Sequence, residues 1–504
     1  MSAGKSTLLL TCTGLFSQFL GFLYRIALAR LISAEVLGLY QLIMPVYAVL
    51  LSLTSVGFTV SLSNLGARYH ALGNLRAVAQ IRRRCLAGFL ISFCPLALFV
   101  VLFSDPISVH LLGDARTQLG LLLLLPCLLL TGLENLHKHY FYGIGDVKPP
   151  AKAELAEQII RTAAILGFLM LFLPQNPERT VGLMVAGMIV CEVFSAITLL
   201  TLYRRYMGPS ERLPGRCVKS SVLRREIWSV FLPVAATSLL GNLMGSANAV
   251  LIPRQLVAGG MDVPEALAEF GVLFGMTLPL LLLPSAFLGA LSLVLTPRLS
   301  RSTALKRTEE SRRLICRAMG ATALLITPAM AFLVVVGPTI GVFLFREPTV
   351  GRYMLPLAAG VLLSSFQSVL AYALNGMDCQ RAVAQNSLIC DAVQLFFTWL
   401  LVKVPGIGLG GFVLGFVVSS ALGFLLNWRA VARTTGLRSQ IFPWLVAPGL
   451  AALLSGLTVN LLFRVLQDAG VMPGLSVAAC AAFGLVLYCA ALQAQGIHFN
   501  SFRL

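Results

Sequence analysis

Apolar segments of about 20 residues recur along the whole chain, and they restrict what it can fold into. A segment of that length matches a helix that crosses the hydrocarbon core of a bilayer. Within the bilayer a helix satisfies its own backbone hydrogen bonds. The sequence therefore predicts an all-α polytopic membrane protein with about fourteen spans, near residues 7–31, 37–64, 85–104, 117–136, 153–173, 181–203, 227–252, 271–296, 314–336, 353–374, 383–403, 407–428, 442–463 and 474–495.

Composition excludes a soluble globule. Of the 504 residues, 58% are hydrophobic and 12% are charged, whereas soluble domains carry roughly 25% charged residues. The net charge of +18 would suggest nucleic acid as a partner of a soluble chain. Here the basic clusters fall on one side of the predicted spans, so the positive-inside rule explains them. We predict a bacterial cytoplasmic membrane protein with cytosolic N- and C-termini, surrounding lipids and no nucleic-acid partner.

Sequence motifs for enzymatic chemistry are weak. The string Gly4-Lys5-Ser6-Thr7 imitates the end of a phosphate-binding loop, but the first glycine and the preceding strand are missing. The string His137-Lys138-His139 reads as a short cytosolic loop without the cysteines or carboxylates of a metal site. The sequence predicts no metal, no cofactor and no enzymatic activity.

The two halves of the chain resemble each other. A polar linker near 204–226 separates six spans from the next six, and Gly143-Ile144-Gly145-Asp146 is echoed by Asn375-Gly376-Met377-Asp378. This pattern favours an N-terminal lobe at 1–215, a C-terminal lobe at 216–436, and two further helices with a short cytosolic tail at 437–504. Internal duplication is typical of secondary transporters that work by alternating access. Proline and glycine permit kinks or unwound turns at three places: Pro45 with Gly57, Pro233 with Gly241, and Pro279 with Pro284.

The first span carries a cation. Arg25 aligns with Gly21, Gln18, Gly14 and Thr11 in a stripe of small and polar residues on one helical face. An intramembrane arginine costs about 2.5–3.5 kcal/mol on insertion scales and is by default a hypothesis of function. A polar stripe faces protein or a water-filled cavity. The alternative is snorkelling towards the outer leaflet, and the sequence leaves both interpretations open.

Four stretches of the sequence resemble those of a known family. They are Gly21-Phe22-Leu23-Tyr24-Arg25 with Gly38-Leu39-Tyr40-Gln41, Tyr142-Gly143 through Glu157-Gln158-Ile159-Ile160-Arg161, Phe270-Gly271 through Leu283-Pro284-Ser285, and Leu295-Thr296-Pro297-Arg298-Leu299-Ser300. They resemble the stage V sporulation protein B group of oligosaccharide flippases, within the multidrug, oligosaccharidyl-lipid and polysaccharide exporter superfamily. The resemblance implies two six-helix bundles in a V-shaped arrangement plus two C-terminal helices. The chain is also similar to lipid II flippases, although Gln18 stands where their first span has an arginine.

The resemblance implies an anionic substrate, a lipid-linked oligosaccharide or a lipid II-like peptidoglycan precursor. A guanidinium suits its phosphate because the group stays protonated and donates two parallel hydrogen bonds. We expect Arg25 and Gln18 to bind substrate, with Arg30 and Arg254 as further contacts. For both of these, the alternative is interfacial anchoring.

Four charged residues at membrane depth are predicted to act as gate or coupling groups. Glu157 and Arg161, spaced four apart, form a gate or a structural pair. Glu192 and Asp391 are lone carboxylates that suit proton coupling, unless each is simply hydrogen-bonded to a neighbouring helix.

The leading functional hypothesis is a flippase for envelope or spore-cortex polysaccharide synthesis, with envelope-synthesis proteins as further partners. A drug/cation antiporter of the same fold would require carboxylates in the N-terminal lobe. A glycosyltransferase would require acidic clusters in large outer loops, and the predicted loops are short. A non-transporting scaffold for envelope assembly remains open.

Overall fold

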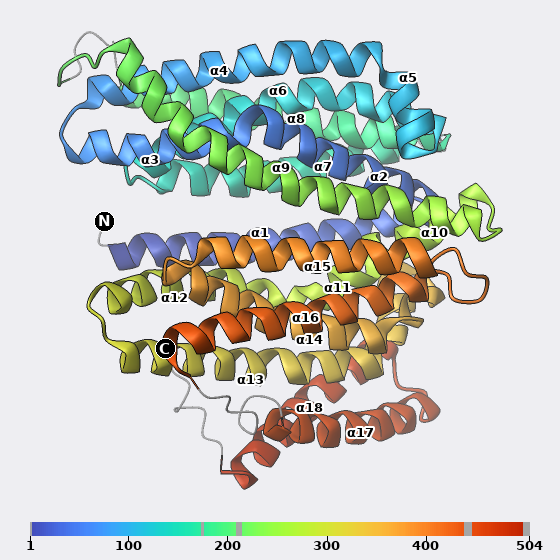
Figure 1. The fold of residues 1–504 in the computed structure, drawn as a ribbon. Helices are drawn as coiled ribbons and strands as arrows, with labels where there is room; N and C mark the ends of the chain where they lie inside the picture. The colour runs from blue at the N-terminus through green and yellow to red at the C-terminus, as the bar shows by residue number, and fades with distance from the viewer. Residues whose placement is uncertain (1–2, 173–175, 208–213, 438–445, 497–504) are drawn as a thin grey trace. The chain divides into compact units, whose positions relative to one another are not determined.

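The computed structural model describes residues 3–172, 176–207, 214–437 and 446–496, with side chains described from residue 12 onward except at 206 and 207. These residues form helices and turns and no strand. The uninterrupted long helices (Figure 1) are α1 (Ala3–Leu31), α4 (Leu75–Leu102), α6 (Gln118–Gly143), α7 (Lys148–Phe172), α8 (Pro177–Met207), α9 (Ser220–Ala258), α13 (Thr308–Ile340), α14 (Met354–Gly376), α15 (Gln380–Leu401), α16 (Leu409–Thr435), α17 (Ala447–Asp468) and α18 (Pro473–Ala494).

Two further spans are interrupted. The first is α2 (Ala34–Leu51), a π-helical turn η1 (Ser52–Val56) and α3 (Gly57–Ala71). The second is α10 (Val263–Gly271), η5 (Val272–Thr277), α11 (Leu278–Leu282), η6 (Leu283–Ala286) and α12 (Phe287–Ala304). These breaks fall where the sequence places Pro45 with Gly57 and Pro279 with Pro284, whereas α9 continues without a break through Pro233. Short turns complete the described elements: α5 (Ser104–Pro106), η2 (Ile107–Leu112), η3 (Ala115–Thr117), η7 (Gly341–Phe345) and η8 (Pro348–Gly351).

Thirteen helices within the described residues are long and apolar enough to cross a membrane. The predicted span at 383–403 corresponds to α15, which does not meet that criterion; it carries polar residues such as Asn386 and Asp391. The count of fourteen spans therefore stays a prediction, while the multi-pass all-α class is confirmed.

The loop predicted at His137 through His139 is wrong. These residues lie within α6, which continues to Gly143. His137 is buried, and its ring nitrogens lie 2.7 Å from the Leu133 carbonyl oxygen and 3.2 Å from Arg82 Nη1. The helix extends beyond its apolar stretch because neighbouring helices supply partners for its polar side chains.

The backbone repeats itself at a spacing of 233 residues. Three of the four described residues with a positive φ angle in the first half have a counterpart in the second at that distance: Gly73 and Lys306, Gly113 and Arg346, and Gly145 and Asp378. The same spacing relates Gly143, at the end of α6, to Gly376, at the end of α14. The helices α6, α7 and α8 thus correspond to α14, α15 and α16, and the internal repeat predicted from the sequence is visible in the backbone.

By packing, the chain divides into two compact units, Met1–Arg254 and Gln255–Leu504. Most of α9 belongs to the first unit. Its Phe231 ring lies 4.3 Å from that of Phe58 in α3, and its Asn242 donates a 2.6 Å hydrogen bond to Ser52 in η1. The boundary between the packing units, at Arg254, thus differs from the lobe boundary at 215 that we predicted from the sequence repeat. The lobe boundary stays a prediction.

Each unit has its own apolar core. In the first, Leu62 of α3, Phe89 of α4 and Phe141 of α6 are fully buried. A Cβ atom at Gly132 would lie 2.1 Å from the Phe89 ring, so only glycine admits this ring between α4 and α6. In the second unit, the fully buried core residues include Leu295 of α12, Ile315 of α13 and Phe366 of α14.

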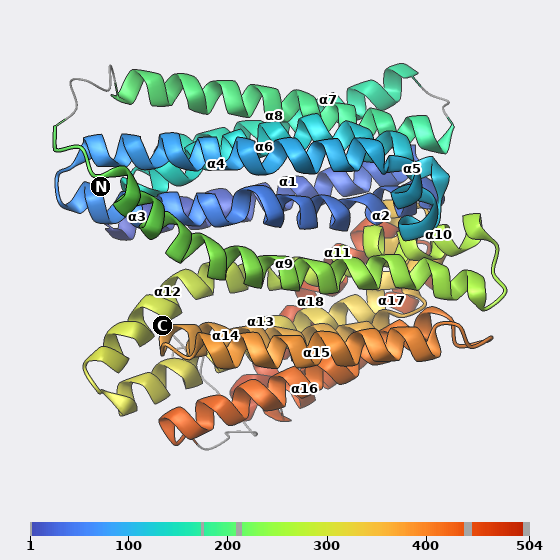
Figure 2. The ribbon, with the colours of Figure 1, turned by 45° about the horizontal axis from the view of Figure 1, so that its top comes forward.

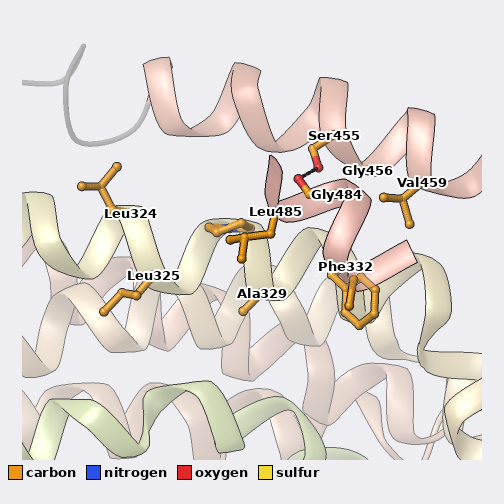
Figure 3. Close-up of a pocket in the computed structure, with 11 residues that line it drawn as sticks. Leu324, Leu325, Ala329, Phe332, Ser455, Gly456, Val459, Gly484 and Leu485 are labelled. Atoms are coloured by element: carbon orange, nitrogen blue, oxygen red, sulfur yellow. Dashed lines mark hydrogen bonds between the residues drawn. The ribbon is translucent and has the colours of Figure 1, made fainter. Parts of the chain in front are cut away.

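The last two helices pack on α13 and border an apolar pocket in the second unit (Figure 3). Phe332 and Val459 line it, and Ser455 donates a 2.8 Å hydrogen bond to the Gly484 carbonyl oxygen. The lining contains no charged residue. The pocket therefore lacks a partner for a phosphate group.

Candidate functional site

Five charged side chains meet in the interior of the first unit. Glu134 and Lys138 lie one turn apart on α6, Glu157 and Arg161 one turn apart on α7, and Glu192 projects from α8. Residues four apart share a helical face, and α8 packs against both α6 and α7 (Figure 2). We call these five residues the α6–α8 charge network.

Cations and carboxylates alternate along the network. Lys138 Nζ lies 2.5 Å from Glu134 Oε1 and 3.0 Å from Glu157 Oε2. Arg161 Nη2 pairs with Glu157 Oε1 and lies 3.3 Å from Glu192 Oε1. The order is therefore Glu134, Lys138, Glu157, Arg161, Glu192, and one unbroken chain of ion pairs joins three helices.

The network is buried and carries unequal charge. The side chains of Glu134 and Glu192 are only 2% and 3% exposed, and that of Lys138 is 14% exposed. Buried charges require partners because desolvation is costly. Three carboxylates face two cations, so one negative charge is left over when every group is ionised.

The second repeat has neutral residues at the positions that correspond to the α6–α8 charge network. At 233 residues beyond Glu134 and Arg161 stand Gln367 in α14 and Gln394 in α15. Gln394 donates to the Phe412 carbonyl oxygen at 3.1 Å and accepts from Ser419 at 2.9 Å. Amides therefore suffice to hold this helix trio together. The charges of the first repeat are not a requirement of the fold, which points to a function for them.

Glu157, Arg161 and Glu192 were singled out from the sequence, and the structure brings all three together. Their roles as gate or coupling groups stay predictions. Sequence reasoning missed Glu134 and Lys138. Their spacing of four residues on an apolar helix was the available signal, but the segment around Lys138 was assigned to a loop.

The first span connects to this network through tyrosines. The Tyr24 hydroxyl of α1 is buried and has no hydrogen-bond partner among the described residues. Arg25 and Arg161 both lie within electrostatic range of Tyr24 and of Tyr40 in α2.

Arg25 and Gln18 are exposed on α1. Arg25 makes no hydrogen bond or ion pair within the described part of the chain, so its donors are available to a ligand. Gly21, between them in the stripe, faces α7: a Cβ atom there would lie 3.3 Å from Gln158 Nε2. The side chain of Thr11, the first member of the stripe, lies outside the described residues.

The remaining predicted residues are dispersed. Arg30 is exposed near the end of α1. Arg254 donates to the His110 carbonyl oxygen and lies against Gly113, so it fastens the end of its helix to the turn η2. Asp391 is half-buried on α15 in the second unit, apart from the charge network.

A metal ion does not suit the α6–α8 charge network. Glu157, Cys191 and Glu192 offer ligand atoms within 4.8 Å of one another. However, Arg161 already donates to Cys191 Sγ at 3.4 Å and pairs with both carboxylates. The guanidinium thus stands where a metal ion would bind, and its charge repels one.

Comparison with known proteins identifies relatives of similar length. A family model described as polysaccharide biosynthesis protein matches residues 3–303. "Stage V sporulation protein B" of Bacillus subtilis (strain 168) is 25% identical over 442 residues, covering 87% of this chain and 85% of that protein.

Solved structures share the fold. An inward-facing "multidrug resistance MATE family transporter of the MOP superfamily" superposes with a TM-score of 0.70 at 14% identity, covering 84% of this chain and 96% of that one. "Lipid II flippase MurJ, inward closed conformation" gives a TM-score of 0.68 at 13% identity, covering 96% and 98%. At these identities the likeness concerns the fold alone.

Proposed function

The chain belongs to the polysaccharide biosynthesis protein family, and from this premise we propose that it is a flippase. Its substrate is a lipid-linked oligosaccharide or a peptidoglycan precursor, which it carries from the inner to the outer leaflet of the cytoplasmic membrane by alternating access. The similarity to a stage V sporulation protein and the fold shared with a lipid II flippase support this assignment. The product serves envelope or spore-cortex polysaccharide synthesis.

The observation that carries the proposal is the free guanidinium of Arg25. It lies on a membrane-crossing helix, is exposed, and has no carboxylate partner among the described residues. A fixed cation without a protein counter-charge suits a ligand that brings its own negative charge. The phosphate of a lipid-linked sugar does so, and a guanidinium can bind it through two parallel hydrogen bonds.

Gln18 lies two turns before Arg25 on the same face of α1. Its amide both donates and accepts, as sugar hydroxyls require. Arg30 and Arg254 are secondary contacts in this proposal. The fixing of Arg254 to His110 favours a structural part for it.

Reconstitution tests the function. Purified protein in liposomes is expected to expose a fluorescently labelled lipid-linked oligosaccharide, or labelled lipid II, to a membrane-impermeant quencher on the opposite leaflet. Empty liposomes and liposomes with heat-inactivated protein are the controls. Equal exposure in all three preparations would refute the flippase proposal.

One observation favours the drug/cation antiporter as a second candidate. That function requires carboxylates in the N-terminal lobe, and three of them meet in the α6–α8 charge network. Efflux of ethidium from the same proteoliposomes separates the two functions. A flippase leaves ethidium in place, whereas an antiporter expels it without moving the labelled lipid. If the protein moves neither cargo and yet binds envelope-synthesis proteins, it acts as a scaffold.

A further inference from the structure

One carboxylate oxygen in the α6–α8 charge network has no donor. Glu192 Oε1 faces Arg161 at 3.3 Å, whereas Glu192 Oε2 is fully buried and receives no hydrogen bond from the described residues. Nearby, Glu134 Oε1 accepts from Ser195 at 2.7 Å and pairs with Lys138. Ser195 follows Glu192 by three residues on the same face of α8, so its hydrogen bond to Glu134 places the Glu134 carboxyl group beside that of Glu192. Two adjacent ionised carboxylates cannot hydrogen-bond to each other, because neither has a proton to donate.

We propose that Glu134 and Glu192 together bind one proton, and that this shared proton is the coupling ion of the transporter. The proton supplies the donor that Glu192 Oε2 lacks. It also removes the excess negative charge and leaves two carboxylates opposite two cations. Only the role in coupling rests on the proposed flippase function; binding of the proton rests on the network itself.

Glu157 is the less suitable carboxylate for the proton. It accepts from both cations of the network, Lys138 and Arg161. A proton there would weaken two ion pairs and leave Glu192 Oε2 without a donor. A proton on Glu134 or on Glu192 weakens one ion pair only, and it creates a hydrogen bond between the two carboxyl groups.

The surrounding helices contribute further titratable groups. Within electrostatic range of the network lie Cys127 and Tyr142 of α6, Cys191 of α8, Tyr40 and Tyr47 of α2, and Tyr24 of α1. The cysteines and tyrosines are neutral when protonated and add no cation that would replace the proton.

Infrared difference spectroscopy detects the proton without substrate. Full-length protein in lipid nanodiscs at neutral pH should show the carbonyl stretch of one buried carboxylic acid, and Glu134→Gln and Glu192→Gln should each abolish it. Either glutamine donates its amide N–H to the opposing carboxylate and mimics the protonated pair, so both variants should fold. Asp391→Asn, in the second unit, is the control that should retain this band. A band that persists in both pair variants, or that disappears only in the control, would overturn the proposal.

Transport with an imposed pH gradient tests coupling separately. One coupled proton shifts the equilibrium distribution of substrate between leaflets by up to about tenfold per pH unit. The wild-type protein should show this dependence, and Glu192→Gln should redistribute substrate independently of the gradient. If the infrared band of the carboxylic acid is present but the protein does not flip the lipid, the proton site is supported and the flippase function is refuted. If the protein flips the lipid but the band is missing, or if the pH gradient has no effect on flipping, the proton is not the coupling ion.

Discussion

Replacing Lys138 with methionine removes a central cation of the α6–α8 charge network and keeps most of the side-chain volume. The ammonium contacts Glu134 and Glu157 at 2.5 and 3.0 Å and is only 14% exposed. Removing one partner of a buried ion pair costs about 3–5 kcal/mol. Without Lys138, the carboxylates of Glu134 and Glu157 can take up protons, which offsets part of that cost. We therefore expect the free energy of unfolding to fall by about 3 kcal/mol at pH 8, and by less at pH 6.

Reversible unfolding in mixed detergent micelles measures this loss. Lys152→Met is the matched control, because Lys152 is exposed on α7 and makes no ion pair within the described residues; exposed sites change stability by about 0.5 kcal/mol or less. Adding Glu134→Gln to Lys138→Met restores the original excess of one negative charge and should recover part of the stability. If Lys138→Met costs no more than Lys152→Met at either pH, the network is not the buried cluster described above.

Two other predictions concern the backbone. Lys306 adopts a φ angle of 55° where the first repeat has glycine, so Lys306→Gly should raise thermal stability by about 1 kcal/mol in a detergent melting assay, and a loss of stability would contradict this. A Cβ atom at Gly376 would lie 2.7 Å from the Thr296 carbonyl oxygen, so Gly376→Ala should lower the melting temperature. Gly241→Ala is the control, because a Cβ atom there would meet open space and should leave the melting temperature unchanged. Equal effects of the two substitutions would refute the close approach of α12 and α14.

The sequence predicts helices well because length and hydropathy decide them. Segments that span a bilayer must be helical, and interrupted spans occur at Pro45 with Gly57 and at Pro284. The extension of α6 beyond residue 136 was not predictable from hydropathy. Its last turns carry Lys138 and two histidines, which resemble a loop until their partners on other helices are known.

The candidate site is predictable only in part. The spacing of four residues between Glu157 and Arg161 predicts an ion pair on one helix. Their meeting with Glu134 and Glu192 depends on how α6, α7 and α8 are rotated against one another, and a single sequence does not contain that information. The contrast with Gln367 and Gln394 becomes visible once the backbone sets the repeat spacing at 233 residues.

Flipping by Arg25→Ala proteoliposomes tests the central claim most directly. Hydrogen bonds to a charged group contribute about 1.5–3 kcal/mol, so the alanine variant should flip the labelled lipid-linked oligosaccharide about tenfold to one-hundredfold more slowly than wild type at limiting substrate. Arg83→Ala, which removes an exposed arginine from α4, should flip at the wild-type rate. Flipping by Arg25→Ala at the wild-type rate would contradict the account.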